Sequence, residues 1–152
     1  MAEPKILKFK KLDETLPDPA QATDGSAGYD LCIPYDMTLD SRHITEVPLR
    51  IAVQIPKGWV GLLRPRSGMG REHGISMAVS GIIDSDYRGE LVAYVKTHHN
   101  MPVQVIERGT SVFQLVVVPC LHAKVQIVDK LTETKRGSGG FGSTDEENCH
   151  AE

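Results

Sequence analysis

The sequence predicts an all-β domain, either a barrel or a sandwich, and two observations carry this prediction. The 14 Gly and 9 Pro of the 152 residues are spread so evenly between Pro17 and Pro119 that long helices have little room. Apolar and polar residues alternate over 51–55, 91–95 and 124–128, which is the pattern of a strand with one buried face. The length is that of one domain.

Shorter signals predict the remaining elements. Continuous apolar stretches at 81–83 and 115–118 are typical of strands that are covered on both faces. The only helix that the pattern favours covers 67–73, where Ser67 is placed to cap the first turn and several glycines weaken the helix. Composition changes after residue 131, so we expect a β-barrel domain over 1–131 and a flexible, glycine-rich C-terminal arm over 132–152.

Charge and cysteine content exclude several classes of function. The net charge is −3, from 17 basic and 20 acidic residues, so the chain lacks the field that attracts duplex nucleic acid. Its apolar runs are too short to span a membrane, and its N-terminus lacks the pattern of a secretory signal. Cys32, Cys120 and Cys149 are widely separated, which indicates free thiols. We expect a cytoplasmic protein with no stable nucleic-acid binding and no membrane association.

The C-terminal arm has one large hydrophobic residue, Phe141, within a glycine-rich stretch over 136–144. This stretch formally satisfies G-x-G-x-x-G, but no helix is predicted after it, so the dinucleotide fingerprint does not apply. Two interpretations stay open. The arm is a linker, or it is a segment that closes over a ligand, stacks the Phe141 ring on it and offers N–H groups to an anion.

Asp84 is the first candidate for chemistry, because it directly follows two β-branched residues at the end of a predicted strand. Desolvation in such a place raises the pKa of a carboxyl group toward the range of a general base. The alternative is that Asp84 and Asp86 cap a turn. The residues alone favour neither interpretation strongly.

A second group of candidates suits phosphate. Arg66 and Ser67 lie where a predicted strand meets a loop, and a guanidinium makes two charge-assisted hydrogen bonds to a phosphate. Alternatively, Arg64 and Arg66 pair with surface acids. Asp30 is a candidate oxygen ligand for a hydrated Mg²⁺ ion.

Taken in order, five segments of the chain resemble the five motifs of the trimeric dUTP diphosphatases, the dUTPases. They are AGYDL at 27–31, PRSG at 65–68, GIIDSDYRG at 81–89, GTSVFQ at 109–114 and RGSGGFGST at 136–144. The segments span most of the chain, and the third and fifth are the most specific.

This resemblance implies a jelly-roll-like β-barrel that assembles as a homotrimer with shared active sites. Each site takes the third motif from one subunit, the first, second and fourth from another, and the arm from the third subunit. The implied reaction is the hydrolysis of dUTP to dUMP and pyrophosphate with Mg²⁺ as cofactor. It limits uracil incorporation into DNA and supplies dUMP for thymidylate synthesis.

The resemblance also assigns roles to residues. It makes Asp84 the general base for the attack of water on the α-phosphorus, Tyr87 the support beneath the deoxyribose that leaves no room for a 2'-OH, and Asp30 a ligand of Mg²⁺ through water. Ala78 stands where some members use an Asn, so uracil recognition should depend on backbone groups. The other implied substrate-binding residues are Arg66, Ser67, Gly68 and Gln114 at the phosphates, Ser80, Gly81, Ile82 and Ile83 at the uracil, and Arg136, Phe141, Gly142 and Ser143 in the arm.

Two other functions use a similar scaffold. The dCTP deaminases share the fold, but that family has a Glu where this chain has Tyr94. A non-catalytic nucleotide-sensing regulator is the alternative from another class, with an unknown protein partner that binds the acidic tail 145–152. The fourth motif departs from the family at Ser111, where an Arg is usual, and at Phe113, where the residue is commonly small.

Overall fold

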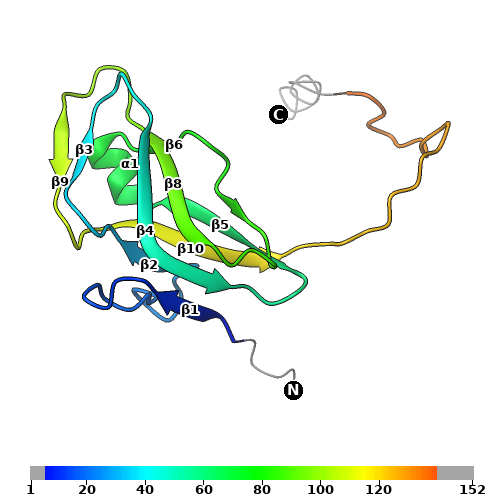
Figure 1. Cartoon of the computed structure of the whole chain (residues 1–152). Coiled ribbons are helices and arrows are strands. Elements are labelled where there is room, and N and C mark those ends of the chain that lie inside the picture. Colours follow the sequence, from blue (N-terminus) through cyan, green and yellow to red (C-terminus); the bar gives the residue numbers. More distant parts are fainter. Residues whose placement is uncertain (1–5, 140–152) are drawn as a thin grey trace. The chain divides into compact units, whose positions relative to one another are not determined.

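The computed structural model describes residues 6–139 of the chain (Figure 1). In chain order, the elements are β1 (Lys8–Lys11), β2 (Gly28–Cys32), β3 (Met37–Leu39), β4 (Thr45–Gln54), β5 (Trp59–Pro65), α1 (Ser67–His73), β6 (Ser76–Met77), β7 (Ile82–Ile83), β8 (Glu90–Lys96), β9 (Gln104–Ile106) and β10 (Ser111–Pro119).

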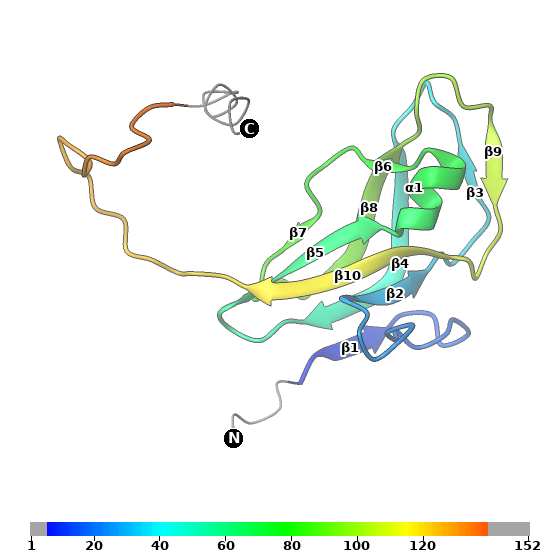
Figure 2. The same ribbon diagram turned by 180° about the vertical axis from the view of Figure 1, so that it is seen from behind.

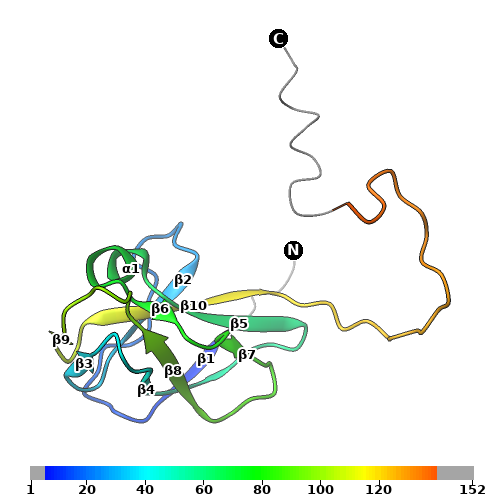
Figure 3. The ribbon, with the colours of Figure 1, turned by 90° about the horizontal axis from the view of Figure 1, so that it is seen from above.

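Three antiparallel sheets make up the fold. The first has the strand order β1-β4-β8-β6, the second has the order β2-β10-β5-β7, and the third pairs β3 with β9. Figure 3 shows α1, β3 and β9 together at one end of the domain. The all-β, jelly-roll-like prediction is confirmed, although within residues 6–139 the sheets do not close into one continuous barrel.

Four of the predicted strands are confirmed. The stretches 51–55, 81–83, 91–95 and 115–118 fall in or overlap β4, β7, β8 and β10. The fifth, over 124–128, forms no strand, and Val125 and Ile127 have exposed fractions of 89% and 90%. A strand needs a neighbour to satisfy its N–H and C=O groups, and none of the described strands pairs with this segment.

The core lies between the two larger sheets. Leu63 of β5 and Leu115 of β10 face it from one sheet, and Leu91 and Val95 of β8 face it from the other. Phe113, a departure from the fourth motif of the family, is fully buried in this core. Burial of apolar surface contributes about 25 cal/mol per Å² to the packing of the two sheets. The packed strands fix the positions at which the loops between them begin.

Helix α1 covers the predicted residues, but its cap differs from the prediction. Ser67 is the first helical residue, whereas Arg66 is the N-cap, with φ −68° and ψ 149° and no capping side-chain hydrogen bond. The N–H of Arg66 donates to the carbonyl of Val112 on β10 at 2.9 Å, so the extended conformation of β5 continues through Arg66. The helix ends at His73 and is capped by Gly74, whose φ of 64° is left-handed.

The chain divides into two compact units, Met1–His122 and Ala123–Glu152. The first contains all of the elements given above, and the described part of the second, residues 123–139, consists of turns and irregular backbone. The division after residue 131 stays a prediction. Among residues 6–139, no helix is long and apolar enough to cross a membrane. Cys32 and Cys120 are free thiols as predicted, and Cys149 lies outside the described residues.

Candidate functional site

Three neighbouring strands bring candidate residues side by side. Gln114 on β10 is in register with Asp30 on β2 and with Arg64 on β5. Strand β5 ends at Pro65, and Arg66 connects it to α1. The first, second and fourth motif segments therefore meet at one end of the second sheet.

Arg66 is oriented by two groups from its neighbours. Its Nε lies 3.3 Å from Oδ1 of Asp30, and its Nη1 donates to the carbonyl of Ser111 at 3.3 Å. The Arg66 side chain keeps 40% of its surface exposed, so the guanidinium can still bind a ligand. Ser111 thus contributes through its carbonyl, while its hydroxyl lies 3.3 Å from the Sγ of Cys32.

The other phosphate candidates surround Arg66 in the chain and in the sheet. Ser67 is exposed at the start of α1, and Gly68 has open space where a Cβ would stand. Gln114 is half-buried, and its Nε2 donates to the carbonyl of Pro65 at 3.5 Å. A Cβ on Gly28 would lie 2.5 Å from Oε1 of Gln114, so the glycine makes room for this side chain.

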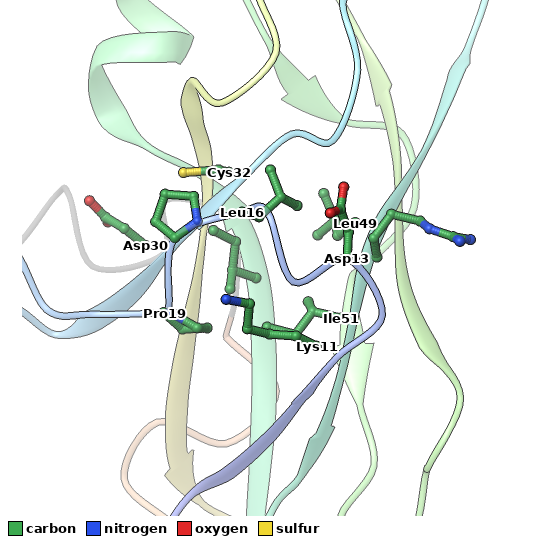
Figure 4. Close-up of a pocket in the computed structure, with 11 residues that line it drawn as sticks. Lys11, Asp13, Leu16, Pro19, Asp30, Cys32, Leu49 and Ile51 are labelled. Carbon is green, nitrogen blue, oxygen red and sulfur yellow. The ribbon is translucent and has the colours of Figure 1, made fainter.

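Asp30 lies at the edge of a small pocket beneath the segment that follows β1. Figure 4 shows its carboxylate pointing away from Lys11 and from the middle of this pocket. The carboxylate instead faces Arg66. Within residues 6–139, no group of three or more His, Cys, Asp and Glu side chains is arranged to hold a metal ion. A lone, partly exposed carboxylate beside candidate phosphate-binding residues fits Mg²⁺, which keeps several waters and takes most of its other ligands from substrate phosphates.

The third motif segment forms a turn beside β5. Gly81 has a φ of 64°, and its carbonyl accepts a hydrogen bond from the N–H of Leu63 at 2.8 Å. A Cβ at Gly81 would lie 2.5 Å from the carbonyl oxygen of Leu63, so this close approach requires glycine. Ser80 is exposed next to it, and Ile82 and Ile83 form β7 against β5.

Arg64 stabilises this turn, a role that the sequence did not indicate. Its Nη1 donates to the carbonyl of Leu63 at 3.0 Å and also to the carbonyl of Ser80. The alternative that Arg64 pairs with surface acids is therefore wrong. An Arg inside an otherwise apolar strand was the available signal, but its partner, a backbone carbonyl sixteen residues away, carries no mark in the sequence.

Asp84 directly follows β7 and precedes a turn. The N–H of Tyr87 donates to the carbonyl of Asp84 at 3.2 Å, and Arg88 donates through Nη1 to the carbonyls of Ser85 and Tyr87 at 2.9 and 2.7 Å. The segment is a turn, and these contacts involve its backbone carbonyls; that the Asp84 and Asp86 side chains cap the turn stays a prediction. Asp84 is exposed to solvent, so the expected desolvation of its carboxyl group is not present in a single chain.

Tyr87 lies over the backbone of its own turn. Its hydroxyl donates to the carbonyl of Glu90 at 2.9 Å, and a Cβ at Gly89 would lie 2.3 Å from that hydroxyl oxygen. The ring has 44% of its surface exposed. A cleft of about 330 Å³ opens beside it, lined by Ile82, Ile83, Asp84, Tyr87, Glu90, Val92 and Tyr94.

The two groups of candidate residues lie at opposite ends of β5. Gly61 pairs with Ile83, so Asp84 comes beside the start of β5, whereas Arg66 follows its end. Figure 2 shows β5 leading from the end of β7 toward α1. Six residues of extended chain separate these positions by about 20 Å. A single chain therefore does not bring Asp84 to the phosphate candidates.

The arm contributes one described candidate. Arg136 is exposed, its Nε donates to the carbonyl of Gly139 at 3.0 Å, and the N–H of Gly139 donates to the carbonyl of Arg136 at 3.1 Å. These bonds form a local turn. Phe141, Gly142 and Ser143 lie outside the described residues, so their roles stay predictions.

The sequence matches a protein family and many of its curated members. The dUTPase family model matches residues 14–145. Deoxyuridine 5'-triphosphate nucleotidohydrolase of Burkholderia cenocepacia is 43% identical over 145 residues, covering 91% of this chain and 97% of that protein. The protein of the same name from Anaeromyxobacter is 39% identical over 145 residues, covering 93% of this chain and 98% of that one.

Solved structures share the fold. A variant of the dUTPase of Staphylococcus bacteriophage 80alpha, in complex with dUpNHpp, superposes with a TM-score of 0.82 at 26% identity, covering 92% of this chain and 98% of that one. A variant of the dUTPase of phage phi11 of S. aureus, which coordinates a structural Mg(II) ion, superposes with a TM-score of 0.74 at 24% identity, covering 85% of this chain and 100% of that one.

Proposed function

This chain belongs to the dUTPase family, and we propose that it hydrolyses dUTP to dUMP and pyrophosphate with Asp84 as the general base. The family match over most of the chain is the observation that carries this proposal. In the reaction, a water oxygen bonds to the α-phosphorus, the bond from that phosphorus to the bridging oxygen breaks, and pyrophosphate leaves. Asp84 takes the proton of the water.

Uracil is read by the free edge of β7. Among the described strands, β7 is at the end of its sheet, and the carbonyl of Gly81 is already used by Leu63. Because alternate residues of a strand direct their backbone groups to opposite edges, those of Ile82 face the free edge. One N–H and one C=O from one residue match the acceptor and the N3–H donor on the edge of uracil. Cytosine presents the reverse pattern and is rejected.

The phosphates are held by the group around Arg66. Its guanidinium is oriented by Asp30 and Ser111, which lowers the cost of binding an anion with a flexible side chain. Ser67, Gly68 and Gln114 add donors beside it. Asp30 fits as a ligand, through water, of a Mg²⁺ ion bound to the phosphates, and when bound the ion stabilises the charge of the leaving pyrophosphate.

The active site is shared between chains of a homotrimer. A triphosphate has to reach both Asp84 and Arg66, yet about 20 Å of β5 separates these residues in one chain. Each site is therefore formed by the base of one chain and the phosphate-binding residues around Arg66 of a second chain. The arm, with Arg136, Phe141, Gly142 and Ser143, comes from the third chain and closes over the bound nucleotide.

Pyrophosphate release tests the proposal. The purified full chain with Mg²⁺ is given dUTP, UTP, dTTP or dCTP separately, and release from dUTP alone is expected. Release of ammonia from dCTP would assign a deaminase instead. If none of the four nucleotides reacts, the proposal fails, and tight binding of dUpNHpp in the same preparation would then assign a nucleotide-sensing protein.

A further inference from the structure

Arg50 has an unusual backbone conformation at the point where β4 meets β8. Among residues 6–139 it is the one non-glycine residue with a positive φ, 53°. The register between the two strands shifts here, because Pro48 pairs with Val92 and Ala52 pairs with Glu90. Arg50 lies in the resulting bulge. A side chain at positive φ is strained, so neighbouring groups must hold it.

Glu90, the first residue of β8, supplies that support. The N–H of Arg50 donates to Oε1 of Glu90 at 2.8 Å, and Nη1 of Arg50 lies 3.7 Å from Oε2. The carbonyl of Arg50 accepts from the N–H of Leu12 at 2.8 Å. Both backbone groups of the strained residue are thus satisfied, one of them by a carboxylate that reaches across from the neighbouring strand.

The same glutamate contacts Tyr87 through its backbone. The Tyr87 hydroxyl donates to the backbone carbonyl of Glu90 at 2.9 Å. The ring lies against Gly89, where a Cβ would be 2.3 Å from the hydroxyl oxygen. The position of the ring therefore depends on where the backbone of Glu90 lies, and the Glu90 carboxylate fixes that backbone to β4 through Arg50.

We propose that Glu90 is a positioning residue that sets the place of the Tyr87 ring and thereby the discrimination between a deoxyribose and a ribose. This inference depends on the proposed function, in which the ring packs beneath the sugar. Glu90 itself does not touch the reacting atoms. Glu90 lines the cleft beside Tyr87 and holds the start of β8. Without the Glu90 side chain, the Tyr87 ring can move, and a ribose 2'-OH then has room in the cleft.

The test compares kcat/KM for dUTP and for UTP. In Glu90→Ala, the ratio of the two values is expected to fall about three- to tenfold, the factor that corresponds to one hydrogen bond. Glu90→Gln keeps an oxygen that accepts from the Arg50 N–H, so this variant should retain most of the ratio. Arg50→Gly keeps the N–H and removes the strain, and it should retain the ratio as well.

Asp40→Ala is the matched control, since Asp40 also pairs with an arginine, Arg42, and accepts its backbone N–H, but lies in a separate turn. Circular dichroism and the melting temperature of each variant establish that it is folded. An unchanged ratio in folded Glu90→Ala would overturn the inference, and so would an equal fall in Asp40→Ala. Failure of the wild-type chain to hydrolyse dUTP would instead overturn the proposed function.

Discussion

Arg66 and Asp30 meet across a strand that lies between them. Nε of Arg66 is 3.3 Å from Oδ1 of Asp30, although β2 and β5 are separated in the sheet by β10. A cation and an anion are thus held side by side at the end of one sheet. This is the arrangement that suits a metal-bound triphosphate, which carries exposed phosphate oxygens and a hydrated divalent cation together.

Replacing Asp84 by Asn tests the general base. The amide keeps the shape of the side chain but cannot accept the proton of water, so kcat for dUTP should fall by about 10²- to 10⁴-fold. Binding of dUpNHpp, measured by calorimetry, should stay within a few fold. Asp86→Asn, two residues along the same turn, is the control and should keep its activity. Full turnover by Asp84→Asn would show that another group activates the water.

Replacing Arg66 by Lys tests the proposed phosphate-binding residues. An ammonium cannot contact Asp30, the Ser111 carbonyl and a phosphate at once with fixed geometry, so kcat/KM should fall about 10- to 100-fold. Steady-state pyrophosphate release measures this. Arg42→Lys, in an exposed turn, should have no effect. Equal kcat/KM in the two variants would contradict the assignment of Arg66.

Gly81→Ala should break the turn that presents β7. The added Cβ would lie 2.5 Å from the Leu63 carbonyl oxygen in a backbone with positive φ, and the strain should cost about 1–3 kcal/mol of stability as well as the activity. Urea unfolding and dUTP turnover measure the two effects. Gly58→Ala is the comparison, because Gly58 also has a positive φ but has nothing within 4 Å of the new atom. It should keep its activity.

Asp13, in the segment after β1, pairs with Arg108, which follows β9, and this gives a pH dependence. The hydroxyl and N–H of Thr15 and the guanidinium of Arg108 hold the pKa of Asp13 below its ordinary value of 3.8. A folded-state pKa below the unfolded one means that the stabilisation is present above the unfolded pKa and is lost as the pH falls through the folded pKa.

The melting temperature of Asp13→Asn should therefore lie below that of the wild type at pH 7. The difference should shrink as the pH is lowered below 3.8. Thermal melts from pH 7 to pH 2.5 measure it, with the exposed Asp24→Asn of the same segment as control. A difference that stays constant across this range would mean that the ionised carboxylate is not the source of the stability.

Removal of the arm over 132–152 should leave a folded domain with little catalysis. Without Arg136 and Phe141 to cover the nucleotide, turnover of dUTP should fall by about 10²-fold or more. Removal of 145–152 alone should preserve catalysis and should abolish the binding of any protein partner that uses the acidic tail. Full turnover without 132–152 would show that the arm takes no part in closing the site.

The sequence predicts well what depends on short-range patterns. The alternation of apolar and polar residues predicted β4 and β8, and Ser67 to His73 is a helix as expected. The predicted N-cap, Ser67, was wrong because the N–H of Arg66 donates to the carbonyl of Val112. This contact joins residues forty-six positions apart, and local propensities do not predict it. The strand expected over 124–128 has the correct alternation, but alternation states which side chains need cover and does not supply a neighbouring strand.

The motifs gave a set of candidate residues but not their geometry. The motifs named Asp30 and Arg66 for different tasks, and nothing in the chain indicated that they pair with each other. The sequence did not indicate the positive φ of Arg50, because arginine has no special tendency toward it and its backbone is held by the Glu90 carboxylate and the N–H of Leu12, which are distant in the chain. Desolvation of Asp84 was one of two interpretations that the residues left open, and in one chain Asp84 is exposed.

In the proposed shared site, the length of β5 makes catalysis depend on the concentration of chains. Since the proposed base, Asp84, and the proposed phosphate-binding residues around Arg66 lie about 20 Å apart along β5, no side-chain motion within one chain brings them together. Dilution below the concentration at which chains associate is then expected to lower the activity per chain. In the proposed shared site, an isolated chain therefore carries both sets of residues without bringing them together.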